Sequence, residues 1–335
     1  MDTQKLITKL LDEKTKYGDI FKNDGHKLPI DYKNMCKLIH PDVCADPRAT
    51  DAFARLQVLY NEASECVGTG VWEGTNYIEI KTTSGKTLQI KYQYHCVFEI
   101  GEYYVCNRNI IYIFDFSKKK YYNNYIKSIK NIKFADKEME KIFKPLFPTI
   151  VSEYDTPDEK HVIVLSKTTD VFPLRCVIEN FYNGQIPATH LAWMISRMMN
   201  IGCYLKFNGQ VHNGINIDNM FVSLEYHTIL LFGGWWYATN AGEPMIGTTR
   251  DIYSIMPPKV KADKVSNSIT DIESVKAFGR QYLEDTAPQA FKDFLNSGSG
   301  EDSMKEMEKW DEALLESFGK RRFIKIDATV NQVYK

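Results

Sequence analysis

The chain has 335 residues, of which 44% are hydrophobic and 25% are charged, a composition typical of a globular protein with two or three domains. Its formal net charge of -1 gives no bulk attraction to nucleic acid, so we expect no nucleic-acid partner. The first residues lack a signal-peptide hydrophobic region, and no run reaches the roughly 18 apolar residues of a membrane span, so we expect a cytoplasmic protein with no membrane partner.

Residues 1–66 are expected to form a helical module. A short first helix near Leu6 is followed by a loop over residues 17–29 and by two amphipathic helices over 31–40 and 47–65. Two helices joined by a short loop bury their apolar stripes by packing antiparallel. The side chains of these stripes are Tyr32, Met35, Cys36 and Ile39 in one helix and Ala52, Phe53, Leu56, Leu59, Tyr60 and Ala63 in the other.

The loop between these helices carries the tripeptide His40-Pro41-Asp42. Pro41 ends the first helix because it has no backbone N–H and disfavours helical geometry at the preceding residue. His40 and Asp42 fall outside both apolar stripes, so we expect them to be exposed. Lys33 and Lys37 lie one turn apart on the outward face of the same helix.

This arrangement resembles the J-domain, the module that stimulates ATP hydrolysis by DnaK-type chaperones. The match rests on the basic helix, the His-Pro-Asp loop and the downstream pattern Ala52-Phe53-x-x-Leu56-x-x-x-Tyr60, although the Tyr-x-x-Leu-Gly motif common near the J-domain start is missing. The resemblance implies that the tripeptide and the two lysines bind a DnaK-type chaperone ATPase. The alternative is a plain helical hairpin in which Pro41 only breaks the helix.

A linker is expected over residues 67–76, and the pattern then changes to that of an antiparallel sheet of about five strands. A hairpin with its turn at Ser84-Gly85 opens the sheet. A lysine-rich stretch over 118–144 has helical spacing and predicts either a solvated face or, less favourably, a phosphate-binding patch. The other strands of this sheet are expected at 96–100, 103–106 and 110–116, and two more strands are expected at 150–154 and 161–165.

Helices dominate the chain after residue 173. The strongest is expected over 188–207, and the others over 272–284, 288–296 and 304–318. A sheet followed by helices predicts an α+β body with two lobes, over residues 77–170 and 171–335, behind the all-α hairpin.

Residues 211–222 resemble the catalytic loop of protein kinases, H-R-D-x-x-x-x-N, and its following strand. His212 and Asn219 match this motif, the segment at 229–235 resembles the strand that leads to the metal-binding D-F-G, Met256-Pro257-Pro258 stands near the position of A-P-E, and Asp271 opens a helix. The likeness covers roughly residues 77–320 and implies a two-lobed kinase-like fold.

The groups that would handle Mg-ATP are missing at the matching positions. Phosphoryl transfer needs a carboxylate near the substrate hydroxyl and another on Mg²⁺. The first position is Gly214, and the second is Gly234, or Gly233 or Phe232 if the gap is placed differently. A glycine-rich loop is also missing, and Phe114 or Asp115 stands where a phosphate-binding lysine is needed.

We therefore expect a pseudokinase-like body that is not an enzyme and holds no cofactor or metal. The alternative enzyme is an atypical phosphotransferase that uses Asp218 or a carboxylate from elsewhere in the chain. His212 and Asn219 are expected to brace the loop through hydrogen bonds. The aromatic run 235–237 predicts core packing or, alternatively, an aromatic binding surface.

The combined prediction is a co-chaperone whose J-domain-like module brings a DnaK-type ATPase to an unknown client protein bound by the body. A J-domain joined to a degenerate kinase-like domain resembles proteins of tailed bacteriophages, which implies the host cytoplasm. A structural or decoy protein is the other alternative. The seven scattered cysteines contain no Cys-x-x-Cys pair and predict reduced thiols.

Overall fold

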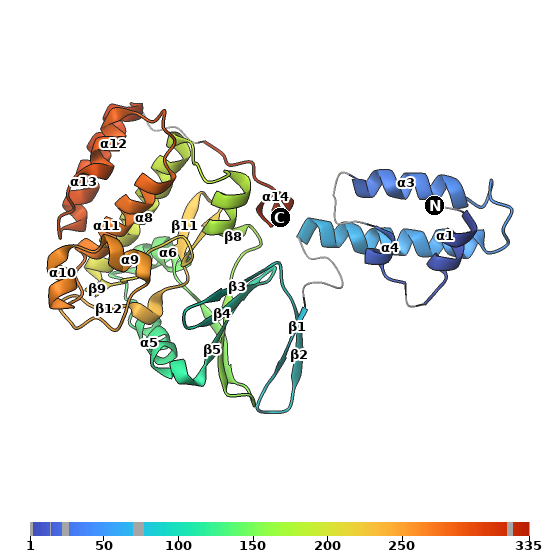
Figure 1. The fold of residues 1–335 in the computed structure, drawn as a ribbon, viewed down its shortest axis with the longest axis horizontal. Helices are drawn as coiled ribbons and strands as arrows, with labels where there is room; N and C mark the ends of the chain where they lie inside the picture. Colours follow the sequence, from blue (N-terminus) through green and yellow to red (C-terminus); the bar gives the residue numbers. More distant parts are fainter. Residues whose placement is uncertain (1–2, 14, 22–26, 70–76, 320–323, 335) are drawn as a thin grey trace.

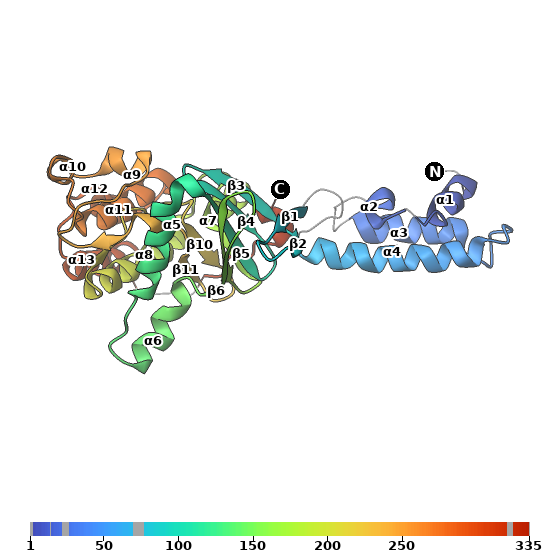
Figure 2. The same ribbon diagram turned by 90° about the horizontal axis from the view of Figure 1, so that it is seen from below.

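The computed structural model describes residues 3–13, 15–21, 27–69, 77–319 and 324–334. Figures 1 and 2 show a slender bundle of helices, the helical module, extending from a larger mixed body. The sheet-rich half of the body comes first in the chain and the helical half follows it. The predicted order of an all-α hairpin and an α+β body is confirmed at this level.

The helical module contains α1 (Thr3–Leu10), α2 (Tyr17–Ile20), α3 (Lys27–Ile39) and α4 (Ala49–Thr69). α3 and α4 lie side by side in both views, and the loop at 40–48 joins them (Figures 1 and 2). Their seam includes a stacked pair, Tyr32 and Tyr60, with ring centroids 4.0 Å apart. α3 and α4 therefore pack on each other as a pair of helices.

Three boundaries of this module differ from the expectation. α2 lies inside the predicted loop, and α3 begins at Lys27 rather than near residue 31. Pro29 does not prevent this early start, because the N–H groups of the first helical turn have no intrahelical partner. α4 continues to Thr69, so helix replaces the first part of the predicted linker, and residues 70–76 lie outside the described residues.

Five antiparallel strands form the main sheet in the order β3-β4-β5-β7-β6. The register of the central pair runs from Asn109 opposite Ser166 to Asp115 opposite Lys160. The strands are β3 (Tyr94–Phe98), β4 (Gly101–Val105), β5 (Asn109–Asp115), β6 (Ile150–Asp155) and β7 (Lys160–Ser166).

The predicted first hairpin is correct, but its assignment to the main sheet is wrong. β1 (Tyr77–Lys81) and β2 (Thr87–Lys91) pair only with each other among the described strands. Ile80 is buried with Ile111, Ile113 and Val162 from one face of the main sheet. The hairpin thus covers that face and does not extend an edge of the sheet. The prediction failed because an alternating pattern identifies the apolar face of a strand but not the strand beside it.

The opposite face of the main sheet meets α5 (Lys119–Lys130) and the helical half. Tyr103, Tyr112 and Phe114 on this face share one core with Tyr125 of α5 and with the long helix α8 (Ala188–Phe207). α6 (Lys137–Phe143) projects from the body in Figure 2.

The helical half packs around α8, and the bounds of this helix are the predicted ones, 188–207. A small sheet, β11-β10-β8, lies within it. Its strands and the β9–β12 pair are β8 (Val171–Pro173), β9 (Gln210–Val211), β10 (Met220–Ser223), β11 (Thr228–Leu231) and β12 (Thr239–Asn240). The remaining helices are α7 (Leu174–Cys176), η3 (Val177–Phe181), η4 (Trp235–Tyr237), α9 (Arg250–Ile255), α10 (Pro258–Asp263), α11 (Ile269–Tyr282), α12 (Gln289–Asn296), α13 (Ser303–Phe318) and α14 (Val330–Val333); the short turns η1 (Phe116–Lys118) and η2 (Lys144–Leu146) flank α5 and α6.

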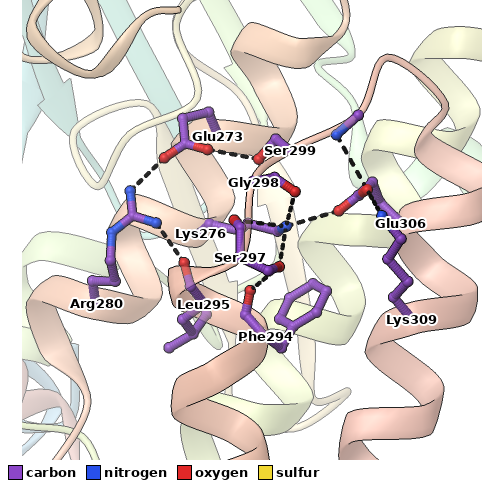
Figure 3. A network of polar contacts seen from close by, with 11 residues as sticks. Glu273, Lys276, Arg280, Phe294, Leu295, Ser297, Gly298, Ser299, Glu306 and Lys309 are labelled. Carbon is purple, nitrogen blue, oxygen red and sulfur yellow. Dashed lines mark hydrogen bonds and ion pairs between the residues drawn. The ribbon is translucent and has the colours of Figure 1, made fainter.

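A buried ion pair joins two helices of this half. The Lys276 ammonium of α11 lies 2.8 Å from the Glu306 carboxylate of α13, and both side chains are at most 1% exposed. Figure 3 shows how the loop after α12 closes over the pair, with Ser297 accepting from the ammonium at 3.0 Å and the Gly300 amide donating to the carboxylate at 3.1 Å. The pair therefore fixes α11, α13 and this loop together.

None of the described helices is long and apolar enough to cross a membrane. All seven cysteines fall within the described residues, and none of them forms a disulfide.

Candidate functional site

The His40-Pro41-Asp42 loop lies at the surface, at the tip of the hairpin between α3 and α4. The side chains of His40 and Asp42 are 45% and 86% exposed. Val43, which follows them, is 73% exposed. A partner protein can therefore reach the whole tripeptide.

Two contacts orient the His40 ring. Its Nδ1 accepts a hydrogen bond from the backbone N–H of Asp42 at 3.2 Å, which leaves the proton of the neutral ring on Nε2. The ring also meets Phe53 edge to face, with centroids 5.3 Å apart. We expected His40 to make no packing contact, but its ring packs against Phe53. Phe53 is half-buried and supports the exposed loop from below.

The loop is tied to the rest of the helical module by Arg48. Its guanidinium binds the Asp46 carboxylate at 2.9 Å and donates to the Gln4 side chain of α1 at 3.0 Å. These hydrogen bonds from Arg48 hold the pKa of Asp46 well below its usual value. Lys33 and Lys37 are both exposed on α3, so the structure places the predicted basic face beside an anchored loop.

A second cluster is the loop at 212–219, which lies in the core of the body. His212 is completely buried, and its Nε2–H donates to the Gly233 carbonyl at 3.1 Å. Burial lowers the pKa of His212 to about 3, so the ring is neutral. Its position fits a histidine that braces the loop.

Asp271 of α11 holds the start of this loop. Its carboxylate accepts from the backbone N–H groups of His212 at 2.7 Å and Asn213 at 2.9 Å. Burial raises the pKa of Asp271 to about 7, against the opposing effect of these two hydrogen bonds. Asn219 closes the other end, because its side-chain amide donates to the Gly214 carbonyl at 2.8 Å.

The two glycines near the expected metal position leave no room for side chains. Gly234 has φ of 80°, and a Cβ placed there would lie 2.3 Å from the His212 ring. A Cβ on Gly233 would lie 2.6 Å from the Asn219 side-chain oxygen. An aspartate at either position would therefore clash with the side chains that pack around these glycines.

Asp218 is held in an ion pair. Its two carboxylate oxygens accept from Nε and Nη2 of Arg175, the second at 2.7 Å. Arg175 also binds Glu179 at 2.5 Å. Arg175 was not predicted, because its pairing with Asp218 joins residues that lie far apart in the sequence.

The aromatic run at 235–237 is core, and the alternative of an aromatic binding surface is wrong. All three side chains are at most 4% exposed. Trp236 stacks on Phe98 of β3 with centroids 4.9 Å apart. Phe114 packs in the same cluster, whereas Asp115 is exposed.

α5 is hydrogen-bonded to this aromatic run by two buried side chains that the sequence analysis missed. The Asn124 amide donates to the carbonyls of Trp236 at 3.0 Å and Ala238 at 2.8 Å. The Tyr125 hydroxyl donates to the Phe232 carbonyl at 2.8 Å. Two polar groups on the inner face of an amphipathic helix are the sequence signal that could have identified them.

Among the described residues, no three His, Cys, Asp or Glu side chains gather in a way that could hold a metal ion. The two clusters lie in different parts of the chain, one on the helical module and one inside the body.

Comparisons with solved structures find similar proteins. The chain is similar to the solved structure of vaccinia related kinase 3, with 16% identity and a TM-score of 0.44 over 80% of this chain and 86% of that one. No protein-family model matches the chain, and no curated protein matches it. A likeness at this level assigns no activity to any residue.

Proposed function

We propose that this chain is a co-chaperone in which a J-domain-like module, residues 1–66, recruits and stimulates a DnaK-type chaperone ATPase. The body holds the client protein. The observation that carries the proposal is the exposed His40-Pro41-Asp42 loop, supported by packing against Phe53, at the tip of a helical hairpin with a lysine face.

The contacts of the loop support a docking role. The proton on His40 Nε2 and the Asp42 carboxylate offer one donor and one acceptor at the surface, close together. Lys33 and Lys37 add positive charge that attracts an acidic patch on the partner. Exposed charge contacts of this kind govern the association rate and weaken with salt, so the complex is transient.

The experiment is single-turnover ATP hydrolysis by a purified bacterial DnaK-type chaperone, with the full chain as the added factor. His40→Gln and Asp42→Asn are expected to abolish stimulation. Gln57→Ala, an exposed change on α4, is the matched control and should stimulate normally. Wild-type stimulation by the His40 variant would refute the assignment.

Thermal melts of the same proteins separate function from folding. His40→Gln loses an aromatic edge contact, which is worth about 0.5–1.5 kcal/mol, so the module should stay folded at the assay temperature. Lys37→Glu should reduce stimulation mainly at low salt, and Lys5→Glu on α1 provides the charge-matched control.

We also propose that the body is pseudokinase-like and transfers no phosphate. The kinase-like assignment is supported by the α+β architecture and by the order His212, Asn219, β10–β11 and Asp271 along the chain. Loss of transfer is supported by glycine at 214, 233 and 234 and by the ion pair that occupies Asp218. No contact among the described residues favours the atypical phosphotransferase over this assignment.

A further inference from the structure

The segment at 324–334 lies against the body like a bound peptide. α14, at the end of this segment, contacts η3 of the body and α4 of the helical module. Figure 1 shows α14 between these two parts of the molecule. Ile326 and Val333 are at most 2% exposed, whereas Asn331 and Gln332 between them are exposed. Two buried anchors separated by exposed residues are typical of a peptide ligand in a groove.

The second anchor combines a hydrogen bond with aromatic contacts. The side-chain amide of Asn180 donates to the Val333 carbonyl at 2.7 Å. The next residue, Tyr334, stacks on Tyr94 with centroids 6.3 Å apart and meets Phe172 at 5.6 Å. Tyr94 belongs to β3 of the sheet-rich half, and Phe172 and Asn180 belong to the helical half, so the occupant bridges both halves.

The turn that presents these anchors is stabilised from within. α14 carries a capping box in which the Gln332 side chain accepts from the backbone N–H of Thr329 at 2.9 Å. The capping box satisfies the N–H groups at the start of this turn, which lowers the cost of ordering the segment on the body.

The fit of the segment leaves room for exchange. A groove of about 750 Å³ runs beside it, lined by Phe172, Leu224 and Val67 together with residues of the segment. The buried hydroxyl of Tyr334 has no hydrogen-bond partner among the described residues. Open space therefore borders the site at Phe172, and one polar group of the occupant is left unsatisfied.

We propose that Tyr94, Phe172 and Asn180 form a peptide-binding site, that residues 330–334 of the chain itself occupy it here, and that it accepts in exchange a partner segment with an aliphatic residue directly before a tyrosine. Its identification as the client site of a co-chaperone rests on the proposed function. The experiment below uses no chaperone, so its failure is distinguishable from failure of the J-domain assignment.

The test uses a fluorescent peptide of residues 324–335 and the full chain. Tyr334→Ala is expected to free the site, so that this variant binds the peptide while wild type does not. A peptide with alanine in place of its tyrosine should bind neither. Asn331→Ala, an exposed change in the same segment, is the matched control and should behave as wild type.

Alkylation of Cys176 supplies a second readout. This thiol is 2% exposed and lies close to both Tyr94 and Tyr334. Its alkylation, followed by mass spectrometry, should be at least about tenfold faster in Tyr334→Ala, because a buried thiol reacts only when it becomes accessible. Added wild-type peptide should restore protection.

Three outcomes would overturn the proposal. The first is equal peptide binding by wild type and Tyr334→Ala. The second is neither peptide binding nor a change at Cys176 in the variant. The third is parallel acceleration at Cys203 of α8, since this would mean that the substitution loosened the whole body. Val333→Asp, which places a charge at the buried position next to Tyr334, must give the same pattern as Tyr334→Ala.

Discussion

His212 is a neutral imidazole in the core, and its neutrality ties loop stability to pH. In the folded protein its pKa is lowered to about 3 by burial, whereas in the unfolded chain it takes up a proton near 6.5. Between these values the unfolded chain binds more protons, so acid favours unfolding through this residue. Asp271 acts in the opposite sense, because its raised pKa lets the folded protein take up a proton near pH 7.

We expect His212→Gln to isolate the histidine contribution. The glutamine amide can still donate to the Gly233 carbonyl but does not titrate. As the pH falls from 7 to 5, the free energy of unfolding of wild type should decrease by about 2 kcal/mol more than that of the variant. Urea unfolding of both proteins at each pH measures it. A difference that is independent of pH would mean that the pKa of His212 is the same in the folded and unfolded states.

Residue positions were predictable where the chemistry is local. The proline at 41 ends α3 at Ile39, as expected, because its effect acts on the preceding residue. The contact of His40 with Phe53 was not predictable, because it depends on the turn at 40–48. The ion pair of Asp218 with Arg175 was not predictable either, because the two residues lie far apart in the sequence and only the tertiary fold brings them together.

At the scale of elements, the buried ion pair of Lys276 and Glu306 connects α11 to α13 in the helical half. Burial alone raises the pKa of Glu306, but the hydrogen bonds from Lys276 and Lys309 outweigh it and the pKa is lowered. The carboxylate is therefore charged and depends on its partners. The Lys276 ammonium also lies 4.6 Å from the centre of the Phe294 ring, which adds a cation–π contact.

Removal of one partner from this pair should destabilise the body strongly. Lys276→Met leaves the Glu306 charge buried beside it, which costs about 3–5 kcal/mol in the free energy of unfolding. The double change Lys276→Met with Glu306→Leu should recover most of this loss. Lys309→Met removes a partner that is 55% exposed and should cost no more than about 1 kcal/mol.

Urea unfolding monitored by tryptophan fluorescence distinguishes these variants. A single Lys276 change as mild as the Lys309 control would show that the pair contributes no net stability. An additive double variant would show that the two groups do not interact.

The attachment of α5 is another property of an element. Asn124→Leu should leave the carbonyls of Trp236 and Ala238 without this donor, and we expect a loss of about 2–4 kcal/mol, since each buried unsatisfied group costs about 1–3 kcal/mol. Asn123→Leu, on the exposed side of the same helix, is the matched control. Equal melting temperatures for the two variants would contradict the attachment.

Elements were predictable in proportion to the length of their pattern. α8 spans 20 residues and its predicted bounds are correct, because a long period leaves little ambiguity. The hairpin of β1 and β2 was correct as a hairpin but wrong in its neighbours, which no local pattern defines. Lys276 and Glu306 each look like surface residues in their own helix, so only the packing of α11 on α13 reveals the pair.

At the scale of the whole molecule, the two parts have separate cores. The cluster of the helical module contains residues from 6 to 67, and the main cluster of the body contains residues from 94 to 334. Segment 324–334 contacts the helical module through α14 and α4. Composition predicted several domains, but the return of this segment to the body could not be predicted, since it depends on tertiary contacts of Tyr334 with Tyr94 and Phe172.

The last prediction concerns the body as a candidate enzyme. Purified full-length protein should transfer no radiolabelled phosphate from Mg-ATP to itself or to generic substrates, and Mg-ATP should not raise its melting temperature. In the proposed pseudokinase-like assignment, glycine at 214 and 234 stands where phosphoryl transfer requires carboxylates.

Reintroduction of those carboxylates should not restore transfer. Gly214→Asp faces the Tyr237 ring at 3.3 Å, whereas Gly234→Asp meets the His212 ring at 2.3 Å and needs a left-handed backbone, which costs about 1–3 kcal/mol before any clash is counted. We therefore expect the Gly234 variant to melt earlier and to remain inactive, alone or with Gly214→Asp. Mg-dependent label transfer by the wild type that disappears in Asp218→Asn would instead establish a phosphotransferase, and the Arg175 ion pair would then have to open during catalysis.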